Sequence, residues 1–321
     1  MDEALLKTAG QHLKAAQSVL VMSHVRADGD AVGSLLGMGM ALRLAGKGVQ
    51  MLLVDGVPQN LKHLPGSEQV QKKIKQPFDF SIMLDSSDVN RVGSIFPNGV
   101  TPDLNIDHHI TNLNFAKINL VDVKAVATAA MLAEFLPPWG YSITPAIADV
   151  LLTGMITDTL GFRTQNMTSQ ALHLAASLVE KGAKLPEMYY HALVQRTFES
   201  ARFWGLGLVD LQREDRIIWT TLTQPARQQV GYPGGDDADL VNFLASIKDV
   251  DVFLVFVEQP QGSIKVSWRS QPGIDVSQVA LDFGGGGHVN AAGADIKGSI
   301  IEVQEKVLQA TRALLNGHAQ H

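Results

Sequence analysis

The stretch SVLVMSHVRADGDAVGSLLGMGMALRLAGKGVQMLLVD (18–55) decides the fold. Two short apolar runs, SVLVMS (18–23) and QMLLVD (50–55), flank a segment with helical periodicity that stops at Gly46 and Gly48. Short runs that are apolar throughout are typical of strands buried on both faces. A strand, a helix and a strand in this order predict a right-handed βαβ unit with parallel strands.

The pattern beyond this unit extends the prediction. DFSIMLD (79–85) and DLNID (103–107) are further buried strands, and residues 145–212 are helical in pattern. A strand, a helix and two more strands follow, and the last two strands form a hairpin that turns at Pro260–Gly262. These four elements are DRIIWTTLT (215–223), DADLVNFLASI (237–247), DVFLVFVEQ (251–259) and SIKVSWRS (263–270).

The sequence therefore predicts the α/β class with two domains. We expect residues 1–190 to form a catalytic domain in which helices cover both faces of a largely parallel sheet. Residues 191–212 are expected to form a connecting helix. Residues 213–321 are expected to form a smaller α/β domain with a mixed sheet, and the active-site cleft should lie between the two domains.

The composition limits the functions open to this chain of 321 residues. A formal net charge of -6 argues against binding to long nucleic-acid duplexes, but not against short oligonucleotides. The chain contains no cysteine, which excludes disulfides and thiolate metal sites and fits a reducing compartment. The apolar runs are too short to span a bilayer, and the charged first residues are unlike a signal peptide. We expect a cytoplasmic protein without a membrane partner.

Acidic and histidine residues gather where the predicted strands end. The four clusters are His24, Asp28 and Asp30; Asp85; Asp107, His108 and His109; and Asp158. In open parallel sheets, ligands bind beyond the carboxyl ends of the strands. Carboxylate and imidazole ligands without thiolates favour Mn²⁺, with Mg²⁺, Co²⁺ or Zn²⁺ as alternatives. Two such ions can activate a water molecule and hold a phosphoryl group for in-line displacement, so the clusters predict a two-metal phosphoesterase.

Three of these residues also have a purely structural explanation. Asp30 suits the N-cap of the following helix, a lone Asp85 suits a turn, and Asp158 suits a cap at a helix end. If the strand continues through residues 107–109, the two histidines point in opposite directions, so that one binds metal and the other faces a different partner. The preceding aspartate is then placed to accept the spare ring N–H of a ligand histidine.

The second domain carries further candidates. Gly284–His288 offers consecutive backbone N–H groups that can form an anion nest beside a histidine, although glycine runs are usually flexible loops. Arg269, on a predicted strand, suits a bidentate phosphate contact, with a solvated strand residue as the alternative. Arg163 in GFRTQNMTS is a similar candidate near Asp158.

These motifs resemble, in order and spacing, the four N-terminal motifs of the DHH family of phosphoesterases. SWRS (267–270) and FGGGGHVNAAGA (283–294) resemble the DHH-associated domain of its branch of bifunctional oligoribonucleases, or nano-RNases, and 3′-phosphoadenosine-5′-phosphate phosphatases. The similarity covers essentially the whole chain.

The resemblance implies a role for each candidate residue. One metal would be held by His24, Asp28 and Asp85, and the second by Asp30, Asp85, His108 and Asp158, with Asp85 as the bridge. The catalytic set would be Asp85, Asp107, His108 and His109, of which His109 contacts the scissile phosphate. The substrate would be bound by His109, Arg163, Arg269, Gly285, Gly286, Gly287 and His288.

By the same resemblance, the protein is an Mn²⁺-dependent oligoribonuclease of the exonuclease type. It would hydrolyse very short RNA to 5′-mononucleotides and take 3′-phosphoadenosine 5′-phosphate as a second substrate. A cyclic di-AMP or pApA phosphodiesterase is the alternative within the class. A non-catalytic nucleotide-binding protein on the same fold is the alternative outside it, and the intact ligand set argues against that reading. The expected partners are short RNA oligonucleotides or small nucleotides, and the resemblance is compatible with a homodimer.

Overall fold

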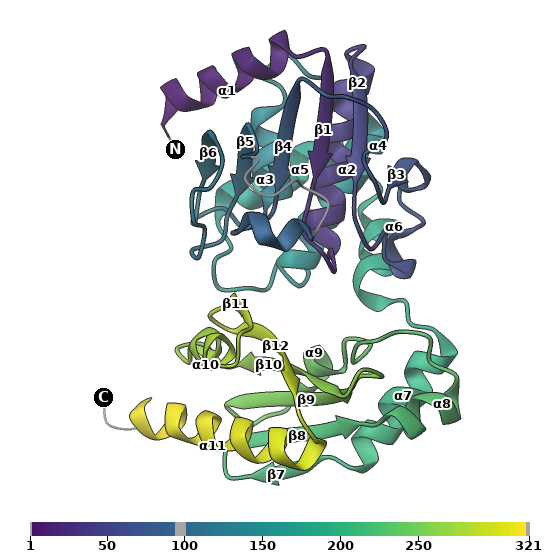
Figure 1. The fold of residues 1–321 in the computed structure, drawn as a ribbon, viewed down its shortest axis with the longest axis vertical. Coiled ribbons are helices and arrows are strands. Elements are labelled where there is room, and N and C mark those ends of the chain that lie inside the picture. Colours follow the sequence, from purple (N-terminus) through teal and green to yellow (C-terminus); the bar gives the residue numbers. More distant parts are fainter. Residues whose placement is uncertain (1, 94–100, 319–321) are drawn as a thin grey trace. The chain divides into compact units, whose positions relative to one another are not determined.

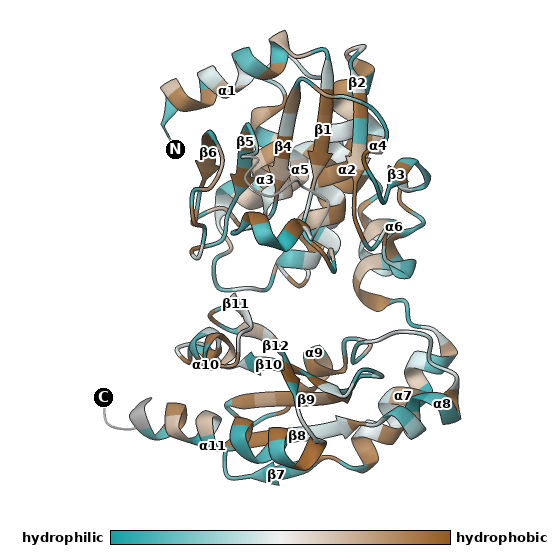
Figure 2. Cartoon of the chain, viewed as in Figure 1, coloured by the Kyte–Doolittle hydropathy of each residue, from teal (hydrophilic) through white to brown (hydrophobic). Residues whose placement is uncertain are grey.

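The computed structural model describes residues 2–93 and 101–318 of the chain (Figure 1). Contacts within the chain divide it into two compact units, Met1–Gln195 and Arg196–His321. The division falls inside the segment predicted to connect the domains. Figure 2 shows apolar strands such as β1 and β9 within each unit, as expected for buried sheets. Across the described residues, no helix combines the length and the apolar character needed to cross a membrane.

The first unit is built on a sheet of six parallel strands. They are β1 (Ser18–Met22), β2 (Gly48–Leu52), β3 (Val70–Gln71), β4 (Phe80–Leu84), β5 (Leu104–Asp107) and β6 (Ile118–Val121). The four strands predicted from apolar runs are confirmed as β1, β2, β4 and β5. The two edge strands, β3 and β6, were not predicted, since neither contains a fully buried run.

The strands of this sheet lie in the order β3-β2-β1-β4-β5-β6, so the chain adds strands outward from the centre first on one side and then on the other. From β1 the chain proceeds to β2 and β3 on one side, and from β4 it proceeds to β5 and β6 on the other. This change of side marks a switch point, where the loops after two adjacent strands diverge and leave room for a ligand at their carboxyl ends. His24 follows β1 and Asp85 follows β4, so both lie at the switch point.

Helices cover one face of this sheet. They are α1 (Glu3–Ala15), α2 (Gly29–Leu44), α3 (Thr128–Phe135), α4 (Pro145–Asp158), α5 (Ser169–Glu180) and α6 (Leu185–Tyr189). Val19 and Val21 of β1 face this helical core, whereas Leu20 and Met22 face a second, smaller cluster. The other members of the smaller cluster are Leu52, Ile74, Phe78, Met83, Val92 and Phe115.

The α/β class and the parallel sheet are confirmed. On the face opposite to α2, the described residues form loops and one 3₁₀ helix rather than an α-helix. Val92 ends a short 3₁₀ helix, η3 (Val89–Val92), and Phe115 lies in a loop. Right-handed crossovers explain this placement. Because the chain reverses direction at β4, the connections after β4 and β5 must cross the face opposite to α2.

The helices α2 and α4 run antiparallel and approach closely along three glycines spaced four residues apart. A Cβ atom would lie 2.3 Å from the Thr157 hydroxyl if added at Gly29 and 2.4 Å from the Val150 carbonyl oxygen if added at Gly33. At Gly37 the added atom would lie 2.5 Å from a leucine side chain of α4. Because these three positions carry no side chain, the two helices pack closely, and the last residue of α4 lies beside the start of α2.

The predicted connecting helix is not continuous. Helix α6 passes into one turn of π-helix, η4 (Tyr190–Val194), and the backbone is extended at Gln195. A new helix, α7 (Phe198–Val209), begins after Thr197, whose hydroxyl accepts the Ser200 N–H at 3.1 Å. Threonine is a favoured N-cap, so the local sequence starts a second helix rather than extending the first.

The second unit contains a mixed six-stranded sheet in the order β11-β12-β10-β9-β8-β7, in which only β8 and β9 pair in parallel. The strands are β7 (Gln212–Glu214), β8 (Ile217–Leu222), β9 (Val252–Glu258), β10 (Ser263–Ser270), β11 (Gly286–His288) and β12 (Ala291–Lys297). The predicted hairpin at Pro260–Gly262 is confirmed as the turn between β9 and β10. The mixed sheet is also confirmed.

Helices cover both faces of this second sheet. Besides α7 they are α8 (Gln224–Val230), α9 (Leu240–Leu244), α10 (Val276–Asp282) and α11 (Ile300–His318). Val266 and Trp268 of β10 face α10 and α11, whereas Phe253 and Val255 of β9 belong to the core with α7, α8 and α9. Arg269 alternates with Trp268 along β10, so its side chain leaves the sheet on the α9 face.

Candidate metal centre

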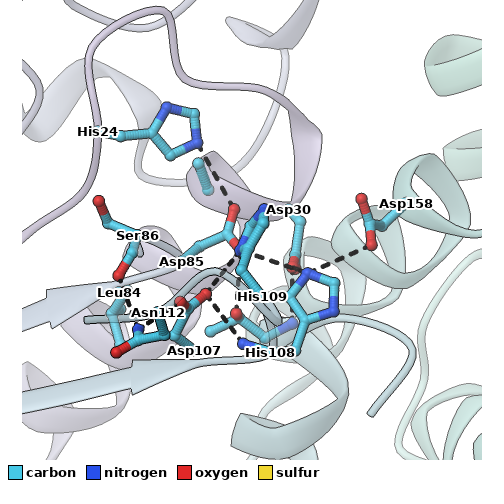
Figure 3. Close-up of polar contacts among 12 residues, drawn as sticks. His24, Asp30, Leu84, Asp85, Ser86, Asp107, His108, His109, Asn112 and Asp158 are labelled. Carbon is cyan, nitrogen blue, oxygen red and sulfur yellow. Dashed lines mark hydrogen bonds and ion pairs between the residues drawn. The ribbon is translucent and has the colours of Figure 1, made fainter. Parts of the chain in front are cut away.

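The structure brings the predicted acidic and histidine residues of the first unit together at the carboxyl end of its sheet (Figure 3). The loops after β1 and β4 supply His24 and Asp85, and the end of β5 with the loop after it supplies residues 107–109. The start of α2 supplies Asp28 and Asp30, and α4 ends at Asp158. The close packing of α2 against α4 therefore places carboxylates from opposite helix ends beside the strand ends.

Asp85 lies at the middle of the cluster and is only 1% exposed. Its Oδ2 atom is 3.6 Å from Nε2 of His24, and its Oδ1 atom is 3.6 Å from Nε2 of His108. Its φ of +53° is rarely adopted by residues other than glycine and costs on the order of 1 kcal/mol or more. The strained backbone aims the carboxylate between two histidines, the orientation expected of a bridging ligand.

Three groups of potential metal ligands contain Asp85: one includes Asp107 and His109, and the other two correspond to the two expected metal sites. Of these two, His24, Asp28 and Asp85 form one group, and Asp30, Asp85 and His108 form the other, each with donor atoms within 4.8 Å of one another. These are the two sets of residues that the resemblance implies. Asp158, the remaining expected ligand, has Oδ2 3.4 Å from Nε2 of His108.

The hydrogen bonds of His24 and His108 leave the same ring nitrogen turned toward the carboxylates. Nδ1 of His24 donates to the Val25 carbonyl at 2.9 Å, and Nδ1 of His108 donates to the Ala125 carbonyl at 3.2 Å. Nε2 of His24 is buried, and Oδ2 of Asp85 lies 3.6 Å from it, beyond the usual length of a hydrogen bond. Histidines that bind metal usually donate the other ring N–H to an oxygen in this way.

Asp30 does not cap the helix that follows it, although its sequence position suits a cap. Asp28, not Asp30, caps α2, because its Oδ1 accepts the N–H groups of Asp30 and Ala31 at 3.1 and 3.0 Å. Asp30 instead accepts the first N–H groups of α3, from Thr128 at 2.6 Å and from Ala129 at 2.8 Å. One carboxylate thus orders α2 and its neighbour orders α3.

Burial and crowding raise the pKa of two of the carboxylates. Burial, together with the charges of Asp85 and Asp158, raises the pKa of Asp30 well above its ordinary value. Burial also raises the pKa of Asp158 to about 7, and Asp28 and Asp85 add to the rise while His108 opposes it. Burial acts on Asp85 in the same direction, but the surrounding histidines outweigh it and lower its pKa. Crowded buried carboxylates of this kind are stable when they coordinate cations, so the residues present fit two divalent ions.

His108 and His109 do not point in opposite directions, because β5 ends at Asp107 before it reaches them. Their ring centroids are 4.8 Å apart, and Nδ1 of His109 is 3.7 Å from Oδ1 of Asp85. Asp107 accepts the Nδ1–H of His109 at 2.7 Å, whereas Nδ1 of His108 donates to the Ala125 carbonyl. Burial lowers the pKa of His109, but Asp107 and Asp85 outweigh it and raise that pKa to about 9.

Sequence reasoning missed three polar residues that hold the centre. The side-chain amide of Asn112 donates to Asp107 at 2.5 Å and to Asn105 at 2.8 Å. The hydroxyl of Thr128 donates to Oδ1 of Asp85 at 3.0 Å. The two asparagines flank the Asp-His-His tripeptide, which was a usable signal, whereas nothing near Thr128 in the sequence marks it.

Arg163 lies in the turn after α4, five residues beyond Asp158. Its backbone N–H donates to the Thr159 carbonyl at 3.0 Å, and its side chain is exposed. Its role as a substrate contact remains a prediction.

The candidates in the second unit share one face of its sheet. Arg269 pairs with Ala291 across β10 and β12, and Ala291 pairs with His288 across β12 and β11. Residues paired in this way project to the same face, so only a small alanine separates the arginine from the histidine. Nε of Arg269 donates to Oδ1 of Asn242 at 2.8 Å, and Nη1 donates to the Trp268 carbonyl at 2.8 Å.

The glycine run is not a loop of consecutive free N–H groups. Gly286, Gly287 and His288 form the edge strand β11, so part of their backbone is paired with β12. A Cβ atom at Gly285 would lie 2.1 Å from the Gly293 carbonyl oxygen, and one at Gly287 would lie 2.4 Å from that of Ala291. Close approach between two strands therefore requires these glycines, whatever their part in binding.

Comparison with known proteins identifies one known domain in each part of the chain. The DHH family, N-terminal domain, matches residues 18–155, and the DHHA1 domain matches residues 223–317. The "Bifunctional oligoribonuclease and PAP phosphatase NrnA" of Thermus thermophilus is 33% identical over 96% of this chain and 93% of its own length. The protein of the same name from Mycoplasma genitalium is 27% identical over 92% of this chain and 94% of its own.

Solved structures show the same fold. An exopolyphosphatase-related protein from Bacteroides fragilis, 24% identical, superposes with a TM-score of 0.88 over 99% of this chain and 97% of its own. RecJ from Thermus thermophilus in complex with Mn²⁺ matches with a TM-score of 0.55 at 13% identity, over all of this chain and 55% of its own. By its two domains and its full-length relatives, the chain belongs to the DHH family of phosphoesterases.

Proposed function

We propose that the protein is a two-metal phosphoesterase that hydrolyses short oligoribonucleotides to 5′-mononucleotides and 3′-phosphoadenosine 5′-phosphate to AMP, with Mn²⁺ as its metal. The proposed two-metal centre is supported chiefly by the position of Asp85, whose two oxygens face His24 and His108 in separate ligand groups. The substrate class is supported by the relatives, which are named for oligoribonuclease and phosphatase activity.

Bound divalent cations would supply the charge that stabilises a phosphoryl transition state and would acidify a water molecule. His24, Asp28 and Asp85 would hold one ion, and the second would be held by Asp30, Asp85, His108 and Asp158. This assignment needs no rearrangement of the histidines, whose Nε2 atoms already face the carboxylates.

His109 would act on the substrate rather than on a metal. Asp107 accepts its Nδ1–H, and Asn112 in turn holds Asp107. These contacts orient the ring, whose Nε2 would donate a hydrogen bond to a phosphate oxygen. A pKa of about 9 keeps the ring protonated at neutral pH, which suits a group that contacts a phosphate anion.

Arg269 and His288 would bind the far end of a short substrate. Two guanidinium nitrogens of Arg269 are held by Asn242 and by the Trp268 carbonyl. The remaining nitrogen, Nη2, is directed by these two bonds and would contact a phosphate or a base edge. The preference for short substrates is supported by the relatives, which are named as oligoribonucleases.

The test is hydrolysis of pApA, a five-nucleotide RNA, a 24-nucleotide RNA and 3′-phosphoadenosine 5′-phosphate, with Mn²⁺ or with EDTA. We expect Mn²⁺-dependent release of mononucleotides from the short substrates and AMP from the last. Asp85→Ala should abolish all of it. Equal or faster cleavage of the long RNA would refute the short-substrate assignment, and nucleotide binding without any turnover would favour a non-catalytic protein.

A further inference from the structure

Thr128, the first residue of α3, contacts both carboxylates of the second ligand group. It is completely buried. Its backbone N–H donates to Oδ2 of Asp30 at 2.6 Å, and its hydroxyl donates to Oδ1 of Asp85 at 3.0 Å. One residue thus sets the position of two acids that come from different elements of the sheet domain.

The hydroxyl bond falls on a particular oxygen of Asp85. Oδ1 is the atom that faces His108 and the second ligand group, whereas Oδ2 faces His24. A hydrogen bond to Oδ1 opposes rotation of the carboxylate about its Cβ–Cγ bond. It also occupies one lone pair of Oδ1 and leaves the other for a cation.

We propose that Thr128 is a positioning residue whose hydroxyl keeps Asp85 in its bridging orientation and thereby sets the affinity of the second metal site and the separation of the two cations. The proposal rests on the two-metal centre of the proposed function. Polar groups that orient a metal ligand typically change metal affinity by about 10–100-fold when they are removed.

Two substitutions at this position separate the hydroxyl from the rest of the side chain. Thr128→Val removes the hydroxyl but keeps the shape and the backbone N–H that Asp30 accepts. Thr128→Ser keeps the hydroxyl and removes a methyl group. Thr153→Val is a matched control, because Thr153 is equally buried and its hydroxyl donates only within α4, to the Asp149 carbonyl at 2.8 Å.

The experiment is titration of the metal-free protein with Mn²⁺, followed by calorimetry and by electron paramagnetic resonance. We expect the unsubstituted protein to bind two Mn²⁺ and to show the multiline spectrum of an exchange-coupled pair at two equivalents. In Thr128→Val the second Kd should rise about 10–100-fold, and the coupled spectrum should be lost at two equivalents. Thr128→Ser and Thr153→Val should resemble the unsubstituted protein, and thermal melts of all variants without metal confirm that each one folds.

Two results would overturn the proposal. Thr128→Val could bind the second Mn²⁺ with unchanged affinity and an unchanged coupled spectrum, in which case the hydroxyl does not position Asp85. Thr128→Ser could lose the second Mn²⁺ as Thr128→Val does, in which case methyl packing is responsible. If the unsubstituted protein binds fewer than two Mn²⁺, the proposed function itself fails, whatever the variants do.

Discussion

Because Asp85 belongs to both ligand groups, its replacement should remove two metal sites, whereas replacement of Asp28 should remove only one. We predict that Mn²⁺ raises the unfolding midpoint of the metal-free protein, that Asp85→Asn abolishes most of the rise, and that Asp28→Asn abolishes about half. Both substitutions preserve local structure. Asparagine at 85 still accepts a hydrogen bond from Thr128, and asparagine is as good a helix N-cap as aspartate.

The size of the shift follows from mass action and from the length of the first unit, Met1–Gln195. A site in equilibrium with free Mn²⁺ at 100 times its Kd stabilises the fold by about 2.7 kcal/mol. For a unit of this length, 1 kcal/mol moves the midpoint by roughly 2–4 °C. One site therefore contributes about 5–11 °C and two sites about 11–22 °C, while the Asp28 variant should retain only the contribution of the second site.

The assay is thermal unfolding followed by circular dichroism, after EDTA treatment and dialysis, with MnCl₂ added in steps. Glu180→Gln, an exposed substitution at the end of α5, is the control and should keep the full shift. A full Mn²⁺ shift in Asp85→Asn would refute the bridging assignment. Equal losses in the Asp28 and Asp85 variants would show that the two ions do not bind in separable groups.

Three further predictions concern the rest of the chain. Gly287→Ala places a Cβ atom against a backbone oxygen and should lower the unfolding midpoint of the second unit in near-ultraviolet circular dichroism, whereas Gly286→Ala meets open space and should not; equal midpoints would contradict the close strand approach. Burial raises the pKa of Asp103, but hydrogen bonds from a lysine and a serine lower it by more, so that the pKa falls below its ordinary value. The ionised carboxylate therefore stabilises the fold above its unfolded pKa, and this stability is lost as the pH falls. Asp103→Asn should therefore cost about 1 kcal/mol at pH 7 in urea unfolding, because the lysine partner is exposed, and the cost should shrink as the pH falls below the ordinary pKa of an aspartate; a loss independent of pH would exclude the charge as its origin. Asn242→Ala should raise the KM for short RNA about 10-fold with little change in kcat, and should have no added effect in Arg269→Ala, whereas additive losses would show that Asn242 acts on its own.

Much of the fold and the candidate site could be predicted because the informative residues occupy regular positions. Candidate ligands such as His24, Asp85 and His108 follow strands of continuous apolar sequence, and parallel strands bring their carboxyl ends to one edge. His24 and Asp85 are therefore near each other in space although they are far apart in sequence. The hairpin between β9 and β10 could also be predicted, because the turn residues Pro260–Gly262 separate two strand-like segments.

The errors arose where a local pattern has two structural solutions. Asp28 and Asp30 are both suitable N-caps, and only the packing of α3 against α2 decides which one caps which helix. The glycine run reads as a loop until the small residues of β12 are seen opposite it. Thr128 could not be found from the sequence, because its partners lie 98 and 43 residues away and belong to other elements.

The glycines of α2 have a consequence for how mutational data on this protein should be interpreted. Gly33 carries no chemistry, yet a methyl group there would collide with the backbone of α4 at 2.4 Å. Separating the two helices would move Asp158 away from His108, so alanine at 33 should abolish turnover as completely as the loss of a ligand. A scan scored by activity alone would then count this glycine among the catalytic residues. Only a measurement of folding alongside activity would distinguish an atom that takes part in the reaction from a space that must stay empty.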